Sequence, residues 1–329
     1  MRVKRTRQQD GTVKLSAQMT AEELKKALDY AYGAFASSMG LQPDPSKTVE
    51  EAARDTLGIT NLSPYIQPFL EERAASLAID ESEIMPAFIP KSVEFSQPKS
   101  GKGIDFECIV MPKPSFELSS YEPVTISVVK PHVFEEDVER EMATYEGFMQ
   151  DFDDPDSREK LRSLVIQKLE DLNAQSFINQ QRQAVSIELA KRLEGQIPDV
   201  IIRNMFAELL EGLKTQLRSQ ETAFSDFLTE HGGEENVNML LMWQARESLR
   251  QGYALDAVYR HEKLKITEED IDATCCTISG LDNPTRARET ARAMGKMHVV
   301  KETAQRFKAS DWAVEQAEVT VREQSLFEE

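Results

Sequence analysis

Apolar and polar residues alternate and then change to a helical period at the start of the chain. Residues 12–18 place an apolar side chain at every second position, which is typical of a half-buried strand. Thr20 is followed three positions later by Glu23, which forms a capping box at a helix start. Apolar residues then recur every three or four positions. This pattern predicts an amphipathic helix over Ala21–Ser38.

Two more helices and a hairpin complete the N-terminal region. One helix is predicted after the capping residue Thr48, and another begins at Ser63-Pro64. Residues 88–96 and 104–111 have strand patterns, and the segment that joins them contains Gly101 and Gly103. We therefore expect a small β-α-α-α-β-β domain over residues 1–112.

The remaining two thirds of the chain is predominantly helical in pattern. Residues 113–133 contain repeated prolines and a β-branched run, which predicts an extended linker that can add a strand. A helix of about 36 residues that ends near Leu193 would span about 54 Å, longer than a compact domain needs. We expect residues 134–329 to form an elongated all-α domain with arms, so the predicted fold class is α+β and predominantly α. Its other predicted helices cover residues 135–149, 198–231 and 235–261, one segment after Thr267 and a final one ending near Trp312.

The chain is acidic, but its charge is distributed unevenly. It has 329 residues with 39 Lys and Arg against 57 Asp and Glu, a formal net charge of −18. Such a surface repels phosphates, which argues against generic nucleic-acid binding, to DNA in particular. Residues 1–14 nevertheless hold five cations and one anion, a net +4. Two interpretations stay open for this segment: a contact with a polyanion at one end of the molecule, or a solvated tail.

No motif in the sequence indicates catalysis, a metal or a cofactor. The P-loop, dinucleotide-binding, H-E-x-x-H and G-x-S-x-G patterns are all missing. The acidic run at Asp153, Asp154 and Asp156 lacks the Gly and terminal Glu of a calcium loop, and helix capping explains it better. We therefore expect a protein that is not an enzyme and needs no cofactor.

Cysteine usage and hydropathy indicate the compartment. Cys108, Cys275 and Cys276 give an odd count without metal-ligand spacing, which favours reduced thiols. The first twenty residues are polar, and no stretch approaches the ~18 apolar residues of a membrane span. We expect a cytoplasmic protein that does not bind membranes.

Five segments, in order along the chain, resemble one family. Residues 13–32 (VKLSAQMTAEELKKALDYAY) are similar to the strand and first helix of the trigger factor ribosome-binding domain, and residues 106–126 to its end and exit linker. Three later segments resemble the C-terminal chaperone domain of that family, namely residues 193–213, 245–272 and 297–319. The resemblance implies an ATP-independent chaperone that binds nascent or unfolded polypeptides, and it implies the same three-part organisation as the pattern does.

The sequence departs from this family at two places. The family has a Phe-Arg-x-Gly-Lys signature at the loop after the first helix, whose cations would contact RNA phosphate and acidic groups. Here the loop carries Asp44, and the residues that correspond to the contact loop are Gly40, Leu41, Gln42 and Lys47. We expect weakened ribosome docking. The family also inserts a prolyl-isomerase domain before the long helix, whereas here the gap between Met149 and Pro155 cannot hold a domain.

Eight apolar side chains are candidates for contact with unfolded clients, because flexible methionines and aromatic rings adapt to many partners. Each has a second interpretation as part of the helix-packing core. A second function also stays open, that of a dedicated assembly or scaffold protein for one partner, and so does a homodimer. The client-binding candidates are Met205, Phe206, Phe224, Phe227, Met239, Met242, Trp243 and Met294.

Overall fold

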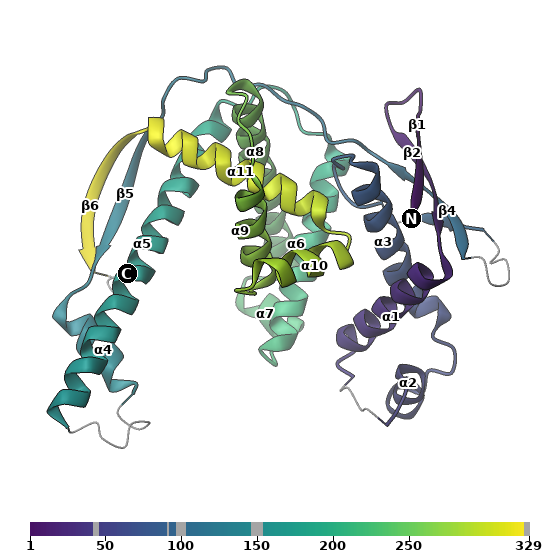
Figure 1. Cartoon of the computed structure of the whole chain (residues 1–329), viewed down its shortest axis with the longest axis horizontal. Coiled ribbons are helices and arrows are strands. Elements are labelled where there is room, and N and C mark those ends of the chain that lie inside the picture. The colour runs from purple at the N-terminus through teal and green to yellow at the C-terminus, as the bar shows by residue number, and fades with distance from the viewer. Residues whose placement is uncertain (42–45, 91, 97–102, 146–153, 326–329) are drawn as a thin grey trace. The chain divides into compact units, whose positions relative to one another are not determined.

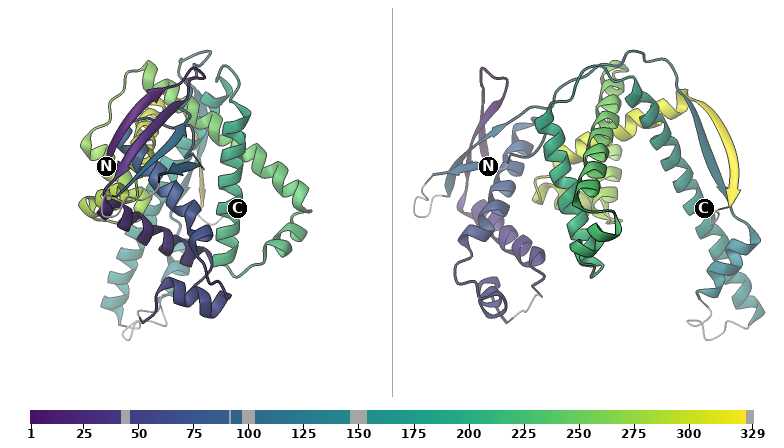
Figure 2. Two further views of the ribbon diagram at one scale, coloured as in Figure 1. Left: turned by 90° about the vertical axis from the view of Figure 1, so that its right-hand side faces the viewer. Right: turned by 180° about the vertical axis from the view of Figure 1, so that it is seen from behind.

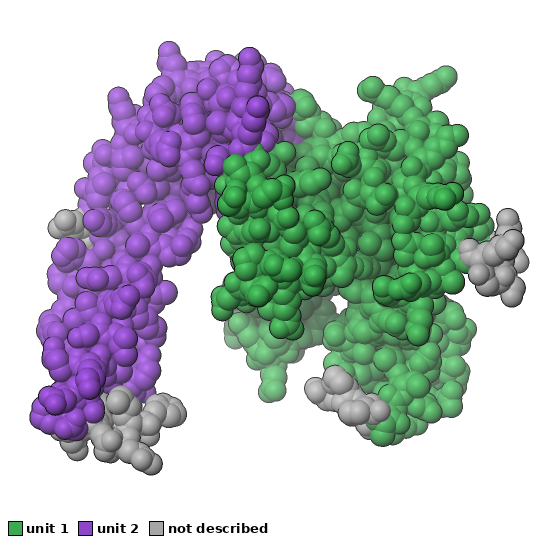
Figure 3. Space-filling model, viewed as in Figure 1, with its two compact units in different colours: residues 1–115, 196–249, 266–305 green, residues 116–195, 250–265, 306–329 purple. Residues whose placement is uncertain are grey.

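The computed structural model describes residues 1–41, 46–90, 92–96, 103–145 and 154–325. Within them helices predominate and strands form two small sheets, which confirms the expected α+β, predominantly α class (Figure 1). The chain divides into two compact units, coloured separately in Figure 3. Unit 1 comprises residues 1–115, 196–249 and 266–305, and unit 2 comprises residues 116–195, 250–265 and 306–329.

The N-terminal part of unit 1 is a four-stranded antiparallel sheet with helices on one face. The strand order is β1-β2-β4-β3. Helices α1 and α3 contact its strands (Figures 1 and 2). The elements are β1 (Arg2–Arg7), β2 (Val13–Met19), α1 (Ala21–Ser38), α2 (Val49–Leu57), α3 (Ser63–Ser82), β3 (Val93–Phe95) and β4 (Ile104–Val110).

Local sequence signals account for two of these helices. Thr20 and Glu23 form the predicted capping box of α1, and Thr48 with Glu51 forms another at the start of α2. Helix α1 has the bounds that the pattern predicts, and α2 begins after Thr48 as expected. The structure adds a strand that the pattern did not predict: β1 pairs along its whole length with β2, so the basic N-terminal segment is not a solvated tail.

Small residues let α3 lie close to the sheet. Ala74, Ala75 and Ala78 are fully buried against the inward side chains of the strands, which include Leu15 and Phe106. Cys108 lies in this core as well, and burial raises the pKa of its thiol to about 11. Its thiol therefore stays protonated at neutral pH.

The rest of unit 1 is helical. The structure separates the predicted 198–231 helix into α6 and α7, because Glu221 adopts a left-handed backbone conformation with φ of 54°. Helices α8 and α11 contribute residues to both units. The bounds are α6 (Asp199–Ser219), α7 (Phe224–Glu230), α8 (Glu234–His261), α9 (Glu268–Ser279), α10 (Pro284–Ala293) and α11 (Met297–Gln316).

The carboxylate of Asp80 on α3 caps helix α11. It accepts hydrogen bonds from the backbone N–H groups of Met297 at 2.9 Å and of His298 at 2.8 Å, and it lies 2.6 Å from His298 Nδ1. Lys296, which precedes the helix, has no side-chain acceptor for these N–H groups. The cap therefore comes from a helix more than 200 residues away in sequence.

A glycine allows the turn before α11 to touch α3. Gly295 has φ of +62°, and a Cβ there would lie 2.9 Å from the backbone N of Leu77 and 2.9 Å from the backbone C of Ser76. A side chain at this position would therefore collide with main-chain atoms that cannot rotate away. The absence of a Cβ lets the turn approach α3 closely enough for the Asp80 cap to form.

Unit 2 is built around one long helix. Strand β5 packs on α5, and β5 pairs in parallel with β6, so the predicted linker does add a strand. The second strand of this pair was not predicted. Asp154 accepts a hydrogen bond from the backbone N–H of Ser157 at 2.9 Å and caps α5, as expected. The bounds are β5 (Thr125–His132), α4 (Glu135–Ala143), α5 (Pro155–Lys191) and β6 (Glu318–Ser325).

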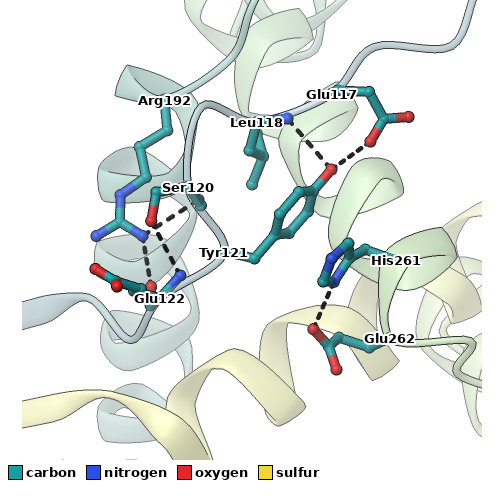
Figure 4. Close-up of polar contacts among 8 residues, drawn as sticks. All are labelled: Glu117, Leu118, Ser120, Tyr121, Glu122, Arg192, His261 and Glu262. Carbon is teal, nitrogen blue, oxygen red and sulfur yellow. Dashed lines mark hydrogen bonds and ion pairs between the residues drawn. The ribbon is translucent and has the colours of Figure 1, made fainter.

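Polar contacts hold the segment that leads into β5 (Figure 4). The Tyr121 ring stacks on His261 with 3.7 Å between ring centroids, and its hydroxyl donates to the Glu117 carboxylate at 2.5 Å. The Arg192 guanidinium donates to the backbone carbonyls of Ser120 and Glu122. Residues at the ends of α5 and α8 thus fix the path of the linker within unit 2.

The Gly295 contact can be tested by Gly295→Ala. We expect a loss of about 1–2 kcal/mol from the left-handed backbone alone, and about 1–3 kcal/mol more because the new methyl group overpacks the contact with α3. Urea unfolding followed by circular dichroism measures the change. Gly280→Ala is a matched control, since Gly280 has φ of +66° and nothing within 4 Å of a Cβ. Equal destabilisation of both variants would show that the close approach contributes nothing.

Candidate functional site

None of the eight apolar candidates is buried in the structure. All eight lie in unit 1, on or beside helices α6, α7, α8 and α10. Three are exposed, namely Met239, Trp243 and Met294, and the other five are half-buried. The sequence could not separate the core interpretation from a surface one. The structure gives each of these side chains some access to solvent.

The most exposed candidates form an apolar row on α8. Met239 and Trp243 are each 64% exposed, and Leu240 between them is 56% exposed. Positions i, i+1 and i+4 of a helix lie on one side, so these side chains form one patch. The opposite side of the helix is buried through Val237, Leu241, Ala245 and Leu249. Leu240 was not among the candidates, although its spacing from Trp243 is the signal that would have found it.

A second set of candidates lies on α6. Met205 and Phe206 are half-buried, and so are Leu209, Leu210 and Leu213 farther along the same helix. The ends of α6 are anchored instead by the buried residues Ile201, Ile202 and Leu217. The middle of α6 therefore offers partly covered apolar side chains that add to the row on α8.

The two phenylalanines of α7 are engaged in local contacts. The Lys214 ammonium lies 5.8 Å from the centre of the Phe224 ring, and the Phe227 ring stacks on His231 with 3.9 Å between centroids. These contacts tie α7 to the end of α6 and to the turn after it. Both residues therefore contribute to the packing of α7 as well as to its surface.

The sequence on both sides of the apolar row on α8 is acidic. Residues 224–247 contain one cation, Arg246. A patch of apolar side chains with acidic neighbours can remain in solution, because like charges oppose self-association. The acidic residues in this range are Asp226, Glu230, Glu234, Glu235 and Glu247.

The loop after α1 is the second candidate region. Gly40 has φ of +67°, and Leu41 packs against the core cluster that contains Phe35. The Lys47 ammonium lies 2.7 Å from the Asp55 carboxylate, an ion pair that lowers the pKa of Asp55. Gln42 lies outside the described residues. Lys47, a cation of this loop, is therefore paired within the chain.

Unit 2 carries exposed apolar side chains that were not among the candidates. Leu164 and Leu172 on α5 are both exposed, and eight positions separate them, which places them on nearly the same side of the helix. Both belong to an apolar stripe in the segment that is predicted to form the long helix. The stripe alone does not reveal which of its members remain uncovered.

Among the described residues, no group of three or more His, Cys, Asp or Glu could hold a metal ion. In the same part of the chain, no helix is long and apolar enough to cross a membrane.

Comparisons with known proteins point to one family. The family described as "Bacterial trigger factor protein (TF)" matches residues 1–145, and its C-terminal counterpart, "Bacterial trigger factor protein (TF) C-terminus", matches residues 157–315. Only residues 146–156 lie between the two matched segments.

Curated relatives and a solved structure carry the same name. A trigger factor of Pelotomaculum thermopropionicum is 24% identical over 53% of this chain and 40% of its own length. That of Thermobifida fusca is 29% identical over 38% of this chain and 27% of its own length. The chain thus spans less than half the length of these relatives. A solved structure of the trigger factor chaperone, from work on promiscuous substrate recognition in folding and assembly, covers 96% of this chain and 99% of its own, with 12% identity and a TM-score of 0.39.

The exposure of the α8 row can be tested by fluorescence, because the chain has two tryptophans. In Trp312→Phe the remaining Trp243 should emit as a solvated indole and be quenched strongly by acrylamide. In Trp243→Phe the remaining Trp312 is half-buried, so its quenching should be weaker. Equal quenching constants for the two variants would contradict the exposed position of Trp243.

Proposed function

Because this chain belongs to the trigger factor family, we propose that it is a cytoplasmic, ATP-independent chaperone that holds exposed apolar segments of nascent or unfolded polypeptides. The observation that carries the proposal is the apolar row of Met239, Leu240 and Trp243, which α8 presents to solvent. A monomeric protein that leaves large apolar side chains together at its surface commonly uses them to bind a partner.

The size of the row indicates how clients are held. Burying a large apolar side chain contributes about 1.5–3 kcal/mol, so three side chains that are about 60% exposed contribute about 3–5 kcal/mol together. Association alone costs at least about 4 kcal/mol. The row on α8 cannot hold a client by itself. A client would have to contact the partly covered side chains of α6 at the same time.

Such multipoint binding suits clients without a common sequence. Methionines such as Met205, Met239 and Met242 have flexible thioether side chains that fit differently shaped partners. The surrounding carboxylates would keep a complex with an unfolded client in solution.

The organisation expected from the sequence belongs to the proposal. Residues 1–112 are the ribosome-binding-type domain, residues 113–133 the linker, and residues 134–329 the client-binding domain. The short interval between the two family matches cannot hold an isomerase domain, because domains rarely have fewer than about 50 residues. The protein therefore holds clients without catalysing prolyl isomerisation.

Docking on the ribosome through the loop after α1 is proposed to be weak. Lys47 pairs with Asp55, and Leu41 packs on the core of its own domain. The same observation favours a second function, in which the protein serves one dedicated partner as an assembly or scaffold protein. A pull-down that yields one stoichiometric partner in place of many nascent chains would support this second function.

Client holding is tested by light scattering of a chemically denatured client that is diluted into buffer without ATP. We expect the wild-type protein to suppress aggregation at near-stoichiometric ratio. Met239→Ser combined with Trp243→Ala should require several-fold more protein for the same effect, because it removes most of the exposed apolar row. Both side chains are largely solvated, so the stability of the chaperone should change little.

A matched control for this experiment is Ile109→Ser. Ile109 is 55% exposed on strand β4 of the N-terminal sheet, and it belongs to none of the helices that carry the client-binding candidates. This variant should suppress aggregation as well as the wild type does. If the wild-type protein gives no protection at several-fold excess, the proposed holding function is wrong.

Ribosome docking is tested by co-sedimentation at about 50 mM and about 200 mM salt. We expect the association to be weak already at the lower salt concentration, because few cations contribute to it, and to fall further at the higher one, because salt weakens each of these contacts. Lys47→Ala should leave the pelleted fraction unchanged. Pelleting that resists salt and depends on Lys47 would contradict the proposed weakness of this loop.

A further inference from the structure

Strand β6 presents a free edge in unit 2. It pairs in parallel with β5 on one side, and no described strand pairs with its other side. Figures 1 and 2 show β6 at the outside of this pair, with β5 between it and α5. Helix α5 packs on β5, whereas no helix of the described residues packs on β6 to a similar extent. A sheet of only two strands depends on further packing for its stability, so a third strand could add to this edge.

The opposite edge of the same sheet is closed. The backbone N–H of Val129 points away from β6 and donates to the Gln180 side chain of α5 at 3.3 Å. Pro131, two residues later on the same edge of β5, has no N–H to donate. Both features prevent another strand from pairing with β5 there. Strand β6 contains no proline. A further strand can therefore add only beside β6.

The pairing with β5 determines which backbone groups of β6 face outward. The N–H of Glu318 donates to the backbone carbonyl of Val124 at 2.9 Å, so Glu318 directs its backbone groups toward β5. Successive residues of a strand direct these groups to opposite edges, and those of Val319 and Val321 therefore lie at the free edge. Val321 is also 46% exposed, although Val128 opposite it on β5 is buried. The free edge thus combines unpaired backbone groups with an uncovered apolar side chain.

The sequence of β6 is complementary to itself in one antiparallel register. When two copies of the strand are aligned about Thr320, Glu318 of each copy lies opposite Arg322 of the other. Val319 of each copy then lies opposite Val321 of the other, so residues with outward backbone groups meet, as an antiparallel ladder requires. Opposite charges, paired valines and paired threonines are cross-strand pairs that stabilise a sheet.

The neighbouring registers lose these pairs. A shift that sets outward backbone groups against inward ones cannot form the ladder. Two copies aligned about Val319, or about Val321, keep the ladder, but Glu318 and Arg322 then lie opposite uncharged residues. The alignment about Thr320 is therefore favoured over both.

The two charges also determine which strand can add. Glu318 and Arg322 are exposed, and neither forms an ion pair with a described residue. The Thr125 hydroxyl donates to the Glu318 carboxylate at 3.2 Å, which leaves acceptor positions on that carboxylate. Charged side chains normally protect an edge strand from pairing. On β6 the two signs are opposite and symmetric about Thr320, so an unrelated strand is disfavoured and a second copy is matched.

We propose that β6 is a dimerisation edge, at which two copies of this chain pair antiparallel about Thr320 and join their sheets in the order β5-β6-β6-β5. Hydrogen bonds from the backbones of Val319 and Val321 hold the two strands together, and the charge pairs select the partner and the register. The interface is small, so the dimer dissociates at roughly micromolar concentration or above. It is separate from the apolar row on α8 and does not depend on client holding.

Analytical ultracentrifugation of the full chain over a concentration series tests the proposal. The wild-type protein should change from monomer to dimer as its concentration rises. Glu318→Arg should self-associate at least about tenfold more weakly, because two cations would face each other at both ends of the interface. Arg322→Glu should have the same effect, since two carboxylates would face each other.

A mixture of these two variants gives the sharpest test. When Glu318→Arg and Arg322→Glu chains are combined in equal amounts, opposite charges face each other again at both ends, so mixed dimers should form about as readily as wild-type dimers. Both substitutions in one chain should restore self-association in the same way. Asp171→Arg is the matched control for Glu318→Arg, since it makes the same change of charge at an exposed position of α5. It should leave the association unchanged.

A cysteine at the centre of the interface reports the register. Directly opposite positions of an antiparallel pair are close enough for a disulfide. Thr320→Cys, combined with Cys276→Ser to remove a half-buried thiol, should give a disulfide-linked dimer with oxidised glutathione. Ser127→Cys in the same background should not, because Ser127 lies on β5, one strand away from the interface.

Several results would overturn the proposal. They are a wild-type protein that stays monomeric at every concentration, a dimer that neither charge reversal weakens, and charge-reversed variants that fold by circular dichroism but stay monomeric when mixed. Protection of the Val321 N–H from hydrogen exchange only after an unfolded client is added to a monomeric wild type would assign the edge to a client strand in place of a second copy.

Discussion

The carboxylate of Asp80 accepts hydrogen bonds from the first two backbone N–H groups of α11, a helix that lacks a capping residue of its own. Four N–H groups at any helix start have no partner within the helix, and leaving them buried is costly. This cap forms only if α3 and the turn before α11 are in contact. Gly295 permits that contact, since its missing Cβ removes a collision with the backbone of Ser76 and Leu77. Unit 1 thus depends on a close approach between two helices distant in sequence.

The same constraint determines which surfaces remain open. The C-terminal half of α3 uses alanines against the sheet and its other side for the α11 turn, so little of that half is available to partners. Helix α8 differs, because apolar residues occupy both its buried side and its solvent side. A helix with apolar residues on both sides is normally buried on both. In α8 one side remains exposed, which is why the proposed client contacts are assigned to it and not to the N-terminal helices.

Local sequence signals predicted the helices whose first residues are capped by neighbours in the sequence. The capping boxes at Thr20 and Thr48 gave α1 and α2 their correct first residues. Strand β6 was missed because its partner β5 lies about 190 residues earlier, and no local pattern reports so distant a pairing.

The candidate client-binding residues could be selected by type. Their exposure could not be predicted, because apolar residues recur on more than one side of α8 and the pattern does not say which side is covered. Gln42 of the loop lies outside the described residues, and the other loop residues could be placed.

Strand β1 was missed for a related reason. Its cations made it look like a solvated tail, because alternation of apolar and polar residues is expected only where a strand has one buried face. An edge strand is under a different constraint: its unpaired backbone groups invite pairing with another chain, and charged side chains prevent this. Positive and negative side chains are equally able to prevent such pairing. The cations of β1 therefore protect an edge that has a partner strand on one side alone among the described residues.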